Sequence, residues 1–503
     1  MKLTPISKRQ ADLFYIVGLC LLFILLYYPV WHADYLYTDE ATQLWYYGKR
    51  AGYQMFANQG RGLTEKLMLW LFGSINTIAQ VKSVRLFSFG GWLLVIPAWY
   101  YVLKSLFVKQ ELPAVLAAVS VSFLICLPGV SISVLWASCL ELFIANTAGL
   151  LSGFFLYRAI KQVGDRIEVS SAPVWLAFLF GLISLFSYQN GFGFYCLPFI
   201  LHALRSPDKK RHIFIGIGGF FVIAAIYFLL FKYNLRTAHV EASARTSLHI
   251  APWNKFKFFF SRPMSSAFHF TYLFNEKNLT GYIVYAVLFG SWIASFWMRN
   301  RKFTFSHRAI SFGLILALLA LSYFPSLLVQ ENYSSNRTTI ALHVAVFILA
   351  AESFFYYWPK AAPRRIVGMA ASLLFIINAA YNTRVLFFQP IQKEYTQLRN
   401  YMNSGYTPTI QAVYFIQPSE DFFVRQYGLT RSWDEFGVPS TFFNWVPEHF
   451  VRQIVFEKTG NRKLAESVRV KQWANQQAFV DFREKVSPAI LLIDAEKIIA
   501  SPK

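Results

Sequence analysis

Long apolar runs are the feature that most constrains how this chain can fold. A run of about 17–25 hydrophobic residues is long enough to cross the hydrocarbon core of a bilayer as a helix. Eleven runs are candidates, although those at 113–127 and 191–204 are short. The candidate spans are residues 13–30, 85–103, 113–127, 132–157, 173–188, 191–204, 213–233, 280–298, 309–329, 338–358 and 365–388. The sequence therefore predicts an all-α polytopic membrane protein with about 11 transmembrane helices.

Composition excludes the other broad classes. Hydrophobic residues make up 55% of the 503 residues and charged residues only 15%. A soluble protein of this composition would expose large apolar patches, and a disordered chain would carry far fewer apolar residues. The 4 cysteines all lie in apolar stretches, so a disulfide framework is not expected.

The basic excess follows the topology. The chain has 48 Lys and Arg against 26 Asp and Glu, a net charge of +22. Most of the excess falls in alternate short loops, as the positive-inside rule predicts for cytoplasmic loops. The N-terminus is then cytoplasmic, the tail is external, and residues 31–84 and 234–279 form long outer loops. We expect the lipid bilayer as a partner and no nucleic acid.

The tail, residues 390–503, differs from the rest of the chain. Residues 412–416 and 490–493 have the pattern of strands, and Pro447 to Lys458 that of a helix capped by Gly460. A second helix is predicted over Leu464 to Gln476. The sequence thus predicts two domains: a transmembrane core at 1–389 and a small extracytoplasmic α/β domain at 390–503. Without a motif, a lid or packing role is the simplest interpretation of this domain.

Acidic residues are rare on the predicted outer face. Outside the tail, that face holds one adjacent pair, Asp39-Glu40, about ten residues beyond the first span. A carboxylate there can act as a general base on a hydroxyl or bind a divalent cation. The alternative is structural: Thr38 or Asp39 would cap an amphipathic helix at the interface.

Four further residues are candidates for a site on the same face. Arg61 lies between two glycines, which lets it approach an anion closely; otherwise it is a loop arginine at headgroup level. Glu141 lies in the outer turns of the run 132–157, or else pairs with a polar neighbour inside the membrane. Arg337 stands at the mouth of a span, about two turns before His343, and can bind a phosphate bidentately or simply anchor the interface.

The second long outer loop, 234–279, is basic and aromatic. Arg245 lies in it, and Lys255 and Lys257 alternate with Trp and Phe side chains. This pattern is typical of an amphipathic segment beside anionic headgroups or a lipid phosphate. Plain membrane anchoring accounts for most of these charges.

With these features placed, the chain resembles the glycosyltransferase C superfamily, polytopic enzymes that use sugars linked to polyprenyl phosphate on the outer face. The resemblance covers the first seven spans, with large outer loops after spans one and seven. Asp39-Glu40 followed by Gly60-Arg61-Gly62-Leu63 is similar to the first loop of O-antigen-modifying glucosyltransferases and of the lipid A aminoarabinose transferase type. The DxD pair of the oligosaccharyltransferase kind is missing.

The resemblance implies an inverting, metal-independent transfer without a cofactor. Asp39 would be the general base, and Glu40 and Glu141 would orient the acceptor hydroxyl or the sugar. The donor phosphate would be bound by Arg61, Arg245, Arg337 and His343. The implied partners are a polyprenyl-phosphate-linked sugar donor and a glycan, lipid or protein acceptor. The implied location is the bacterial cytoplasmic (inner) membrane, with several passes, the N-terminus inside and the C-terminus outside.

Three other functions remain open from the sequence. A lipid-linked glycan transporter (flippase) would need polar residues through several spans and helices broken in matching halves. An O-antigen polymerase or ligase would concentrate arginines in late outer loops and would not need the acid pair. A non-enzymatic scaffold would leave the outer acids and arginines unexplained.

Overall fold

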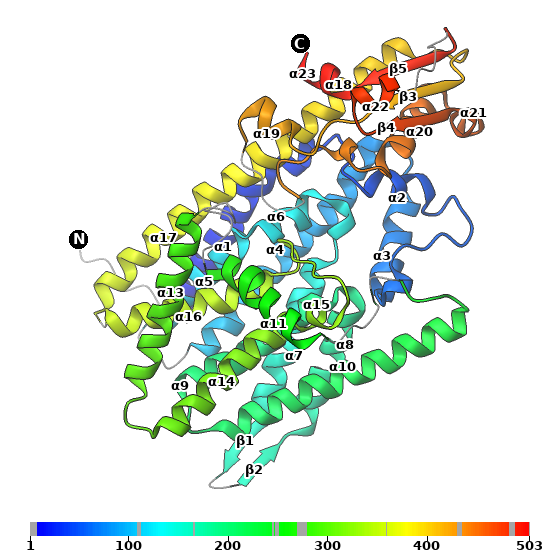
Figure 1. Cartoon of the computed structure of the whole chain (residues 1–503). Helices are drawn as coiled ribbons and strands as arrows, with labels where there is room; N and C mark the ends of the chain where they lie inside the picture. Colours follow the sequence, from blue (N-terminus) through cyan, green and yellow to red (C-terminus); the bar gives the residue numbers. More distant parts are fainter. Residues whose placement is uncertain are drawn as a thin grey trace.

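The protein is mostly helical (Figure 1). The computed structural model describes residues 8–107, 112–163, 166–243, 246, 251–268, 279–358, 360–429, 435–481 and 488–501. Within these residues, seven helices are long and apolar enough to cross a membrane, and an eighth crossing is counted if one bent helix pair forms a single span. The mostly helical fold expected from the apolar runs is therefore confirmed, with helices long and apolar enough to cross a membrane, whereas the count of eleven spans stays a prediction.

The helices of the core follow most of the apolar runs closely. Those before the second outer loop are α1 (Lys8–Tyr27), α4 (Val81–Leu106), α7 (Leu142–Ala159), α8 (Ser171–Ser187), α9 (Leu197–Arg205) and α10 (Lys210–Ala238). Those after it are α13 (Leu279–Arg299), α14 (Phe305–Leu321), α16 (Ile340–Tyr357) and α17 (Ala361–Tyr381). The apolar helices α8 and α14 have only 17 residues each, which is at the lower limit for a span.

Three apolar runs are broken in the structure. The run 132–157 is not one helix, because its first residues belong to α6 (Pro128–Leu135) and α7 begins only at Leu142. Helix α6 meets the preceding helix α5 (Pro113–Ile125) at an angle of 55°, since Pro128 lacks an N–H group and holds Leu127 in an extended conformation. The run 191–204 begins as a 3₁₀ helix, η5 (Gln189–Cys196), that packs tightly on α7. A Cβ atom at Gly149 would lie 2.2 Å from the carbonyl oxygen of Gly191, so this contact requires glycine.

The third break follows α14, where the chain turns into the short helix α15 (Phe324–Leu328). Ser322 and Tyr323 separate the two helices, and Pro325 lies in the first turn of α15, where its missing N–H group is tolerated. The run 309–329 is therefore not one continuous helix. On the opposite side of the molecule, a hairpin of β1 (Ile160–Val163) and β2 (Arg166–Val169) connects α7 to α8.

The two long loops that the sequence predicts to lie outside, named the first and second outer loops, contain short helices. The first holds η1 (Tyr28–His32), α2 (Glu40–Tyr46), η2 (Ala57–Gln59), α3 (Gly62–Gly73) and η3 (Ile78–Gln80). The described part of the second holds α11 (Pro252–Phe259), the π-helix η7 (Phe260–Met264) and α12 (Ser265–Phe268). These segments are the ones that can build a site outside the core helices.

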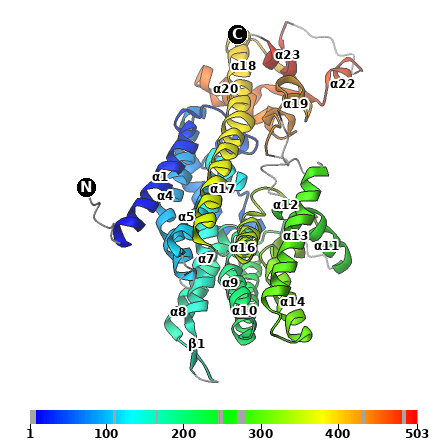
Figure 2. The same cartoon turned by 90° about the vertical axis from the view of Figure 1, so that its left-hand side faces the viewer.

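The tail is an α/β unit that begins with a helix continuing the last core helix. Figure 2 shows α17 running through the π-helix η8 (Asn382–Phe388) into α18 (Gln389–Gly405) as one long rod. A three-stranded parallel sheet follows, with the order β4-β3-β5. Its elements are β3 (Ala412–Ile416), α19 (Phe422–Tyr427), η9 (Ser440–Phe442), α20 (Val446–Thr459), α21 (Arg462–Ser467), β4 (Arg469–Trp473), α22 (Gln476–Asp481), β5 (Ile490–Asp494) and α23 (Ala495–Ala500).

The predicted strands and the first predicted helix of the tail are confirmed. Gly460 ends α20 in the left-handed conformation, with φ at 67°. The predicted helix over Leu464 to Gln476 is wrong, because β4 occupies its centre and pairs in parallel with β3. Strand pairing gives these five residues backbone partners that an isolated helix pattern does not predict.

The tail packs on the first outer loop at one end of the molecule. Both views place α20 at the top and the β1–β2 hairpin at the bottom (Figures 1 and 2). Gln453 of α20 donates to the carbonyl oxygen of Asn76, and Arg462 donates to that of Trp45 at 2.6 Å. The first outer loop and the tail therefore form one continuous surface.

Candidate functional site

One cavity lies where the first outer loop, the core helices and the tail meet. Its volume is about 610 Å³, and its walls come from segments far apart in the sequence. Four of the predicted site residues line it: Asp39, Arg61, Glu141 and Arg337. The structure thus brings together two acids and two arginines that are spread over about 300 residues of chain.

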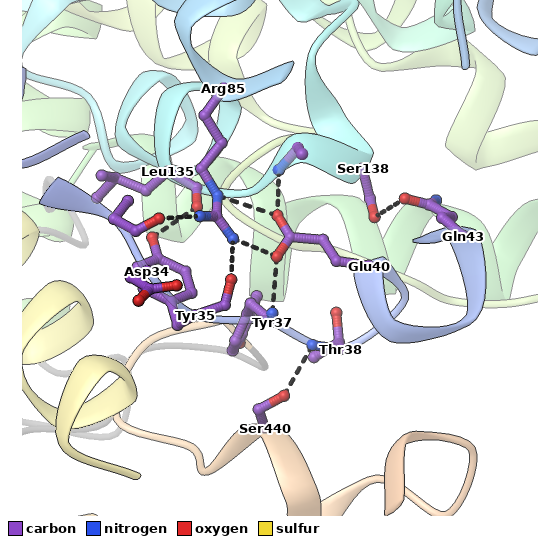
Figure 3. Close-up of polar contacts among 12 residues, drawn as sticks. Asp34, Tyr35, Tyr37, Thr38, Glu40, Gln43, Arg85, Leu135, Ser138 and Ser440 are labelled. Atoms are coloured by element: carbon purple, nitrogen blue, oxygen red, sulfur yellow. Dashed lines mark hydrogen bonds and ion pairs between the residues drawn. The ribbon is translucent and has the colours of Figure 1, made fainter. Parts of the chain in front are cut away.

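Glu40 does not line this cavity, and its carboxylate is already bound. Oε1 accepts hydrogen bonds from Arg85 Nε at 3.2 Å and from the backbone N–H of Ala137 at 2.6 Å. Oε2 accepts from Arg85 Nη2 and from the backbone N–H of Tyr37 at 2.7 Å (Figure 3). Burial raises the pKa of this carboxyl, while Arg85 and the two N–H groups oppose the rise. The prediction that Glu40 orients the acceptor is corrected: it fixes the backbone before Asp39.

The backbone at Thr38 is strained next to the candidate base. Its φ angle is 44°, which is unfavourable for a β-branched residue. The backbone N–H of Thr38 donates to Ser440 Oγ in the tail at 2.8 Å (Figure 3). The hydrogen bonds to Ser440 and to the Glu40 carboxylate hold Thr38 in this conformation. They therefore set the direction of the Asp39 side chain.

The structure does not support the capping alternative for this pair. Asp39 occupies the N-cap position of α2, but its side chain makes no capping hydrogen bond. Thr38 Oγ1 is buried and has no hydrogen-bond partner in the described part of the chain. Both side chains line the cavity instead.

Arg61 enters the cavity from the start of α3. Its Nε donates to Gln189 Oε1 at 3.3 Å, and its guanidinium lies 4.4 Å from the ring centre of Tyr188. The preceding Gly60 has φ at 81°, and a Cβ atom there would lie 2.1 Å from the Tyr227 hydroxyl, so the turn needs glycine. The segment is held further by Glu65, whose Oε2 accepts from three consecutive backbone N–H groups at 55–57.

Arg337 lines the cavity from the loop just before α16. Its guanidinium lies 4.7 Å from the ring centre of Trp136 and donates to the Tyr333 hydroxyl at 3.0 Å. Its Nε lies 3.9 Å from Glu435 Oε1, and the amide of Asn336 donates to the same carboxylate at 3.2 Å. Arg337 is thus positioned by aromatic rings and by an acid from the tail.

Glu141 completes the charged wall. It is 1% exposed, and its carboxyl interacts electrostatically with both Arg61 and Arg337. Its Oε2 lacks a hydrogen-bond partner among the residues that the structure describes, as does Nε1 of the cavity residue Trp136. Buried polar atoms without partners are costly, so such atoms around a cavity indicate groups that a ligand would satisfy.

Two predicted phosphate-binding residues are not placed in this wall. His343 is buried in α16, where its Nδ1 contacts the carbonyl oxygen of Thr339 at 2.9 Å, and it does not line the cavity. Arg245 lies outside the described residues. Among the described residues, no three His, Cys, Asp or Glu side chains are arranged to hold a metal ion.

Sequence reasoning missed several residues that line the cavity. Glu435 is 2% exposed and comes from the tail, where no sequence motif assigned it a role. Gln189 joins two walls, since its Nε2 donates to the Gln59 carbonyl oxygen at 2.7 Å and to the Tyr227 hydroxyl at 2.9 Å. Phe228 and Phe231 of α10 add apolar side chains to the lining.

The fold and the cavity together define a mostly helical membrane protein with an acid- and arginine-lined cavity at one end of its core. Comparisons of the chain with protein-family models, with curated proteins and with solved structures found no match. The function must therefore be argued from the site itself.

Proposed function

We propose that this protein is an inverting glycosyltransferase of the glycosyltransferase C type, which moves a sugar from a polyprenyl-phosphate donor to a cell-envelope acceptor on the outer face of the membrane. The observation that carries the proposal is the convergence of Asp39 and Glu141 with Arg61 and Arg337 on one cavity. The acids are expected to act on the acceptor hydroxyl or the sugar, and the arginines to bind the donor phosphate. Both kinds of residue line this cavity.

The apolar side chains that α10 contributes to the cavity suit a lipid-linked donor. Helix α10 contributes Tyr227, Phe228 and Phe231 to the lining, while other side chains of α10, such as Leu229 and Tyr233, are 67% exposed. In a membrane these exposed side chains would contact lipid. A prenyl chain can therefore lie along α10 while its phosphate reaches Arg61, whose terminal nitrogens make no hydrogen bond within the described chain.

The chemistry needs a base and a cationic group. Asp39 accepts the proton of the acceptor hydroxyl as that oxygen bonds to the sugar C1 from the face opposite the phosphate. The bond between C1 and the phosphate oxygen breaks, and its electron pair leaves with the phosphate. Arg61 and Arg337 stabilise that charge with preorganised donors, and Glu141 orients the sugar through hydrogen bonds to its hydroxyls.

The test is direct transfer. Membranes that contain the protein are incubated with polyprenyl phosphates that carry radiolabelled hexoses or pentoses, together with envelope material from the same cells. The proposal predicts label in the envelope fraction and an anomeric configuration opposite to that of the donor. Retention of configuration, or movement of intact lipid-linked sugar across the membrane without transfer, would refute it and favour the transporter.

A further inference from the structure

An aromatic side chain of the tail stands exposed at the edge of the cavity. Trp445 is 48% exposed although it lines the cavity, so the cavity reaches the surface there. Phe443 lies beside it, with ring centres 5.0 Å apart and an angle of 32° between the rings. The other exposed large hydrophobic residues of the described tail, Tyr401 and Val480, do not line the cavity.

The segment that carries these rings is rigidly held. The Glu394 carboxylate accepts from the backbone N–H groups of Ser440 and Thr441 at 2.8 and 2.9 Å. Gln417 Nε2 donates to the carbonyl oxygen of Phe442 at 2.8 Å. An exposed tryptophan on a loop fixed this firmly is preorganised for a ligand rather than for packing.

Two hydroxyl groups line the same cavity, and Thr38 lies next to this segment because its backbone N–H donates to Ser440 Oγ at 2.8 Å. Thr38 and Thr42, on either side of Asp39 and along α2, line the cavity, and each has an Oγ1 atom without a hydrogen-bond partner in the described ranges. Thr38 is only 3% exposed. The cavity therefore offers a ligand both an apolar ring surface and unused hydroxyl groups.

We infer that Trp445, Phe443, Thr38 and Thr42 form a carbohydrate-binding subsite, so that the acceptor is a glycan. The ring C–H groups of a pyranose form an apolar face that packs on an aromatic ring, while its hydroxyls need hydrogen-bond partners. The sugar-binding subsite is argued from the structure alone, and the inference rests on the proposed function only where it identifies the bound sugar as the acceptor. The apolar lining residues on α10 are the ones suited to lipid, and both views place α10 well below α20, which begins next to Trp445 (Figures 1 and 2).

The test measures sugar binding without turnover. Saturation-transfer NMR is recorded on the full-length protein in detergent micelles with cellobiose, lactose and chitobiose at millimolar concentration. The inference predicts saturation of sugar ring protons by the wild type, and binding about tenfold weaker for Trp445→Ala because the apolar contact area is lost. Trp445→Phe keeps part of the binding, and Thr42→Val, which removes one hydroxyl at nearly constant shape, weakens it.

The controls separate this inference from the proposed chemistry. Trp31→Ala removes a tryptophan that is 54% exposed, packs on Phe89 and does not line the cavity, so it should bind sugar like the wild type. Asp39→Asn should also bind sugar, even though transfer is lost. Undiminished binding by both Trp445→Ala and Thr42→Val, or no binding of the panel by the wild type, would overturn the subsite. Sugar binding by Asp39→Asn with transfer intact would instead refute the proposed base.

Discussion

The Glu40 carboxylate and the Arg85 guanidinium form a fully buried ion pair that ties the first outer loop to helix α4. Arg85 also donates to the carbonyl oxygens of Ala33 and Tyr35, at 3.0 and 2.9 Å, so one arginine organises the whole approach to Asp39. A carboxylate with every strong partner inside the protein has little left for a substrate. The adjacent acids therefore have different roles: Glu40 shapes the loop, and Asp39 faces the cavity.

Removing one partner of this pair should lower stability. Glu40→Gln leaves the Arg85 charge buried without its counterion, a change that typically costs about 3–5 kcal/mol. We expect a lower unfolding temperature in detergent and less folded protein in membranes. Glu466→Gln serves as the control, because its surface pair with Arg462 should contribute under about 1 kcal/mol. An unfolding temperature of Glu40→Gln equal to that of the wild type would mean that the pair does not hold the loop.

Arg61 should act on donor binding more than on stability. Its loss removes charged hydrogen bonds worth about 1.5–3 kcal/mol each, so Arg61→Ala should raise the apparent KM for the polyprenyl-phosphate donor about tenfold to a hundredfold. Arg61→Lys should recover part of this, since it restores charge but not bidentate geometry. Arg50→Ala is the matched control, an exposed arginine of the same loop outside the cavity. A donor KM that is equal in Arg61→Ala and Arg50→Ala would remove Arg61 from the site.

The tail should be needed for turnover even though it is a separate unit. Glu394→Ala releases Ser440 and Thr441, and Ser440 holds the backbone of Thr38, so the strained loop before Asp39 should relax. We expect kcat to fall at least tenfold with a smaller change in donor KM, because misplacing a catalytic group by about 1 Å is costly. Asp481→Ala, a change at an exposed residue of the tail, should leave kcat unchanged. An unaltered kcat in Glu394→Ala would show that the tail is dispensable.

Topology gives an independent check. Because the positive loops alternate along the sequence, reporter fusions at Lys209 and at Gly460 should report opposite sides of the membrane. The structure separates these positions, since Lys209 precedes α10 and Gly460 ends α20. If both fusions report the same side, Asp39 and the tail lose their predicted placement on the outer face.

The apolar periodicity predicted most core helices because hydrophobic length is a local property. It separated the runs at Pro128 but could not predict the end of α6 at Leu135, nor the 3₁₀ segment at Gly191, which depends on packing against α7. The strand β4 was missed for the same reason, because its partner β3 lies more than 50 residues earlier.

The site residues likewise fall into those that the sequence predicts and those that depend on contacts between distant segments. Asp39, Glu141, Arg61 and Arg337 were predicted from residue type and position, and the cavity contains all four. The role of Glu40 was misjudged because its partner, Arg85, stands 45 residues away at the edge of an apolar run. Glu435 was missed because it meets the site only through the folded tail, where its carbonyl oxygen accepts from the Tyr37 hydroxyl across 398 residues.

The most direct test of the account is sugar transfer by Asp39→Asn. This change keeps the shape of the side chain and removes the proton acceptor. Transfer of labelled sugar from a polyprenyl-phosphate donor is measured in membranes with matched protein levels, and the unfolding temperature is measured in parallel. The account predicts that transfer falls about 10²–10⁴-fold while the unfolding temperature stays near that of the wild type. Near-normal transfer by Asp39→Asn would contradict it and would move the general base to Glu141.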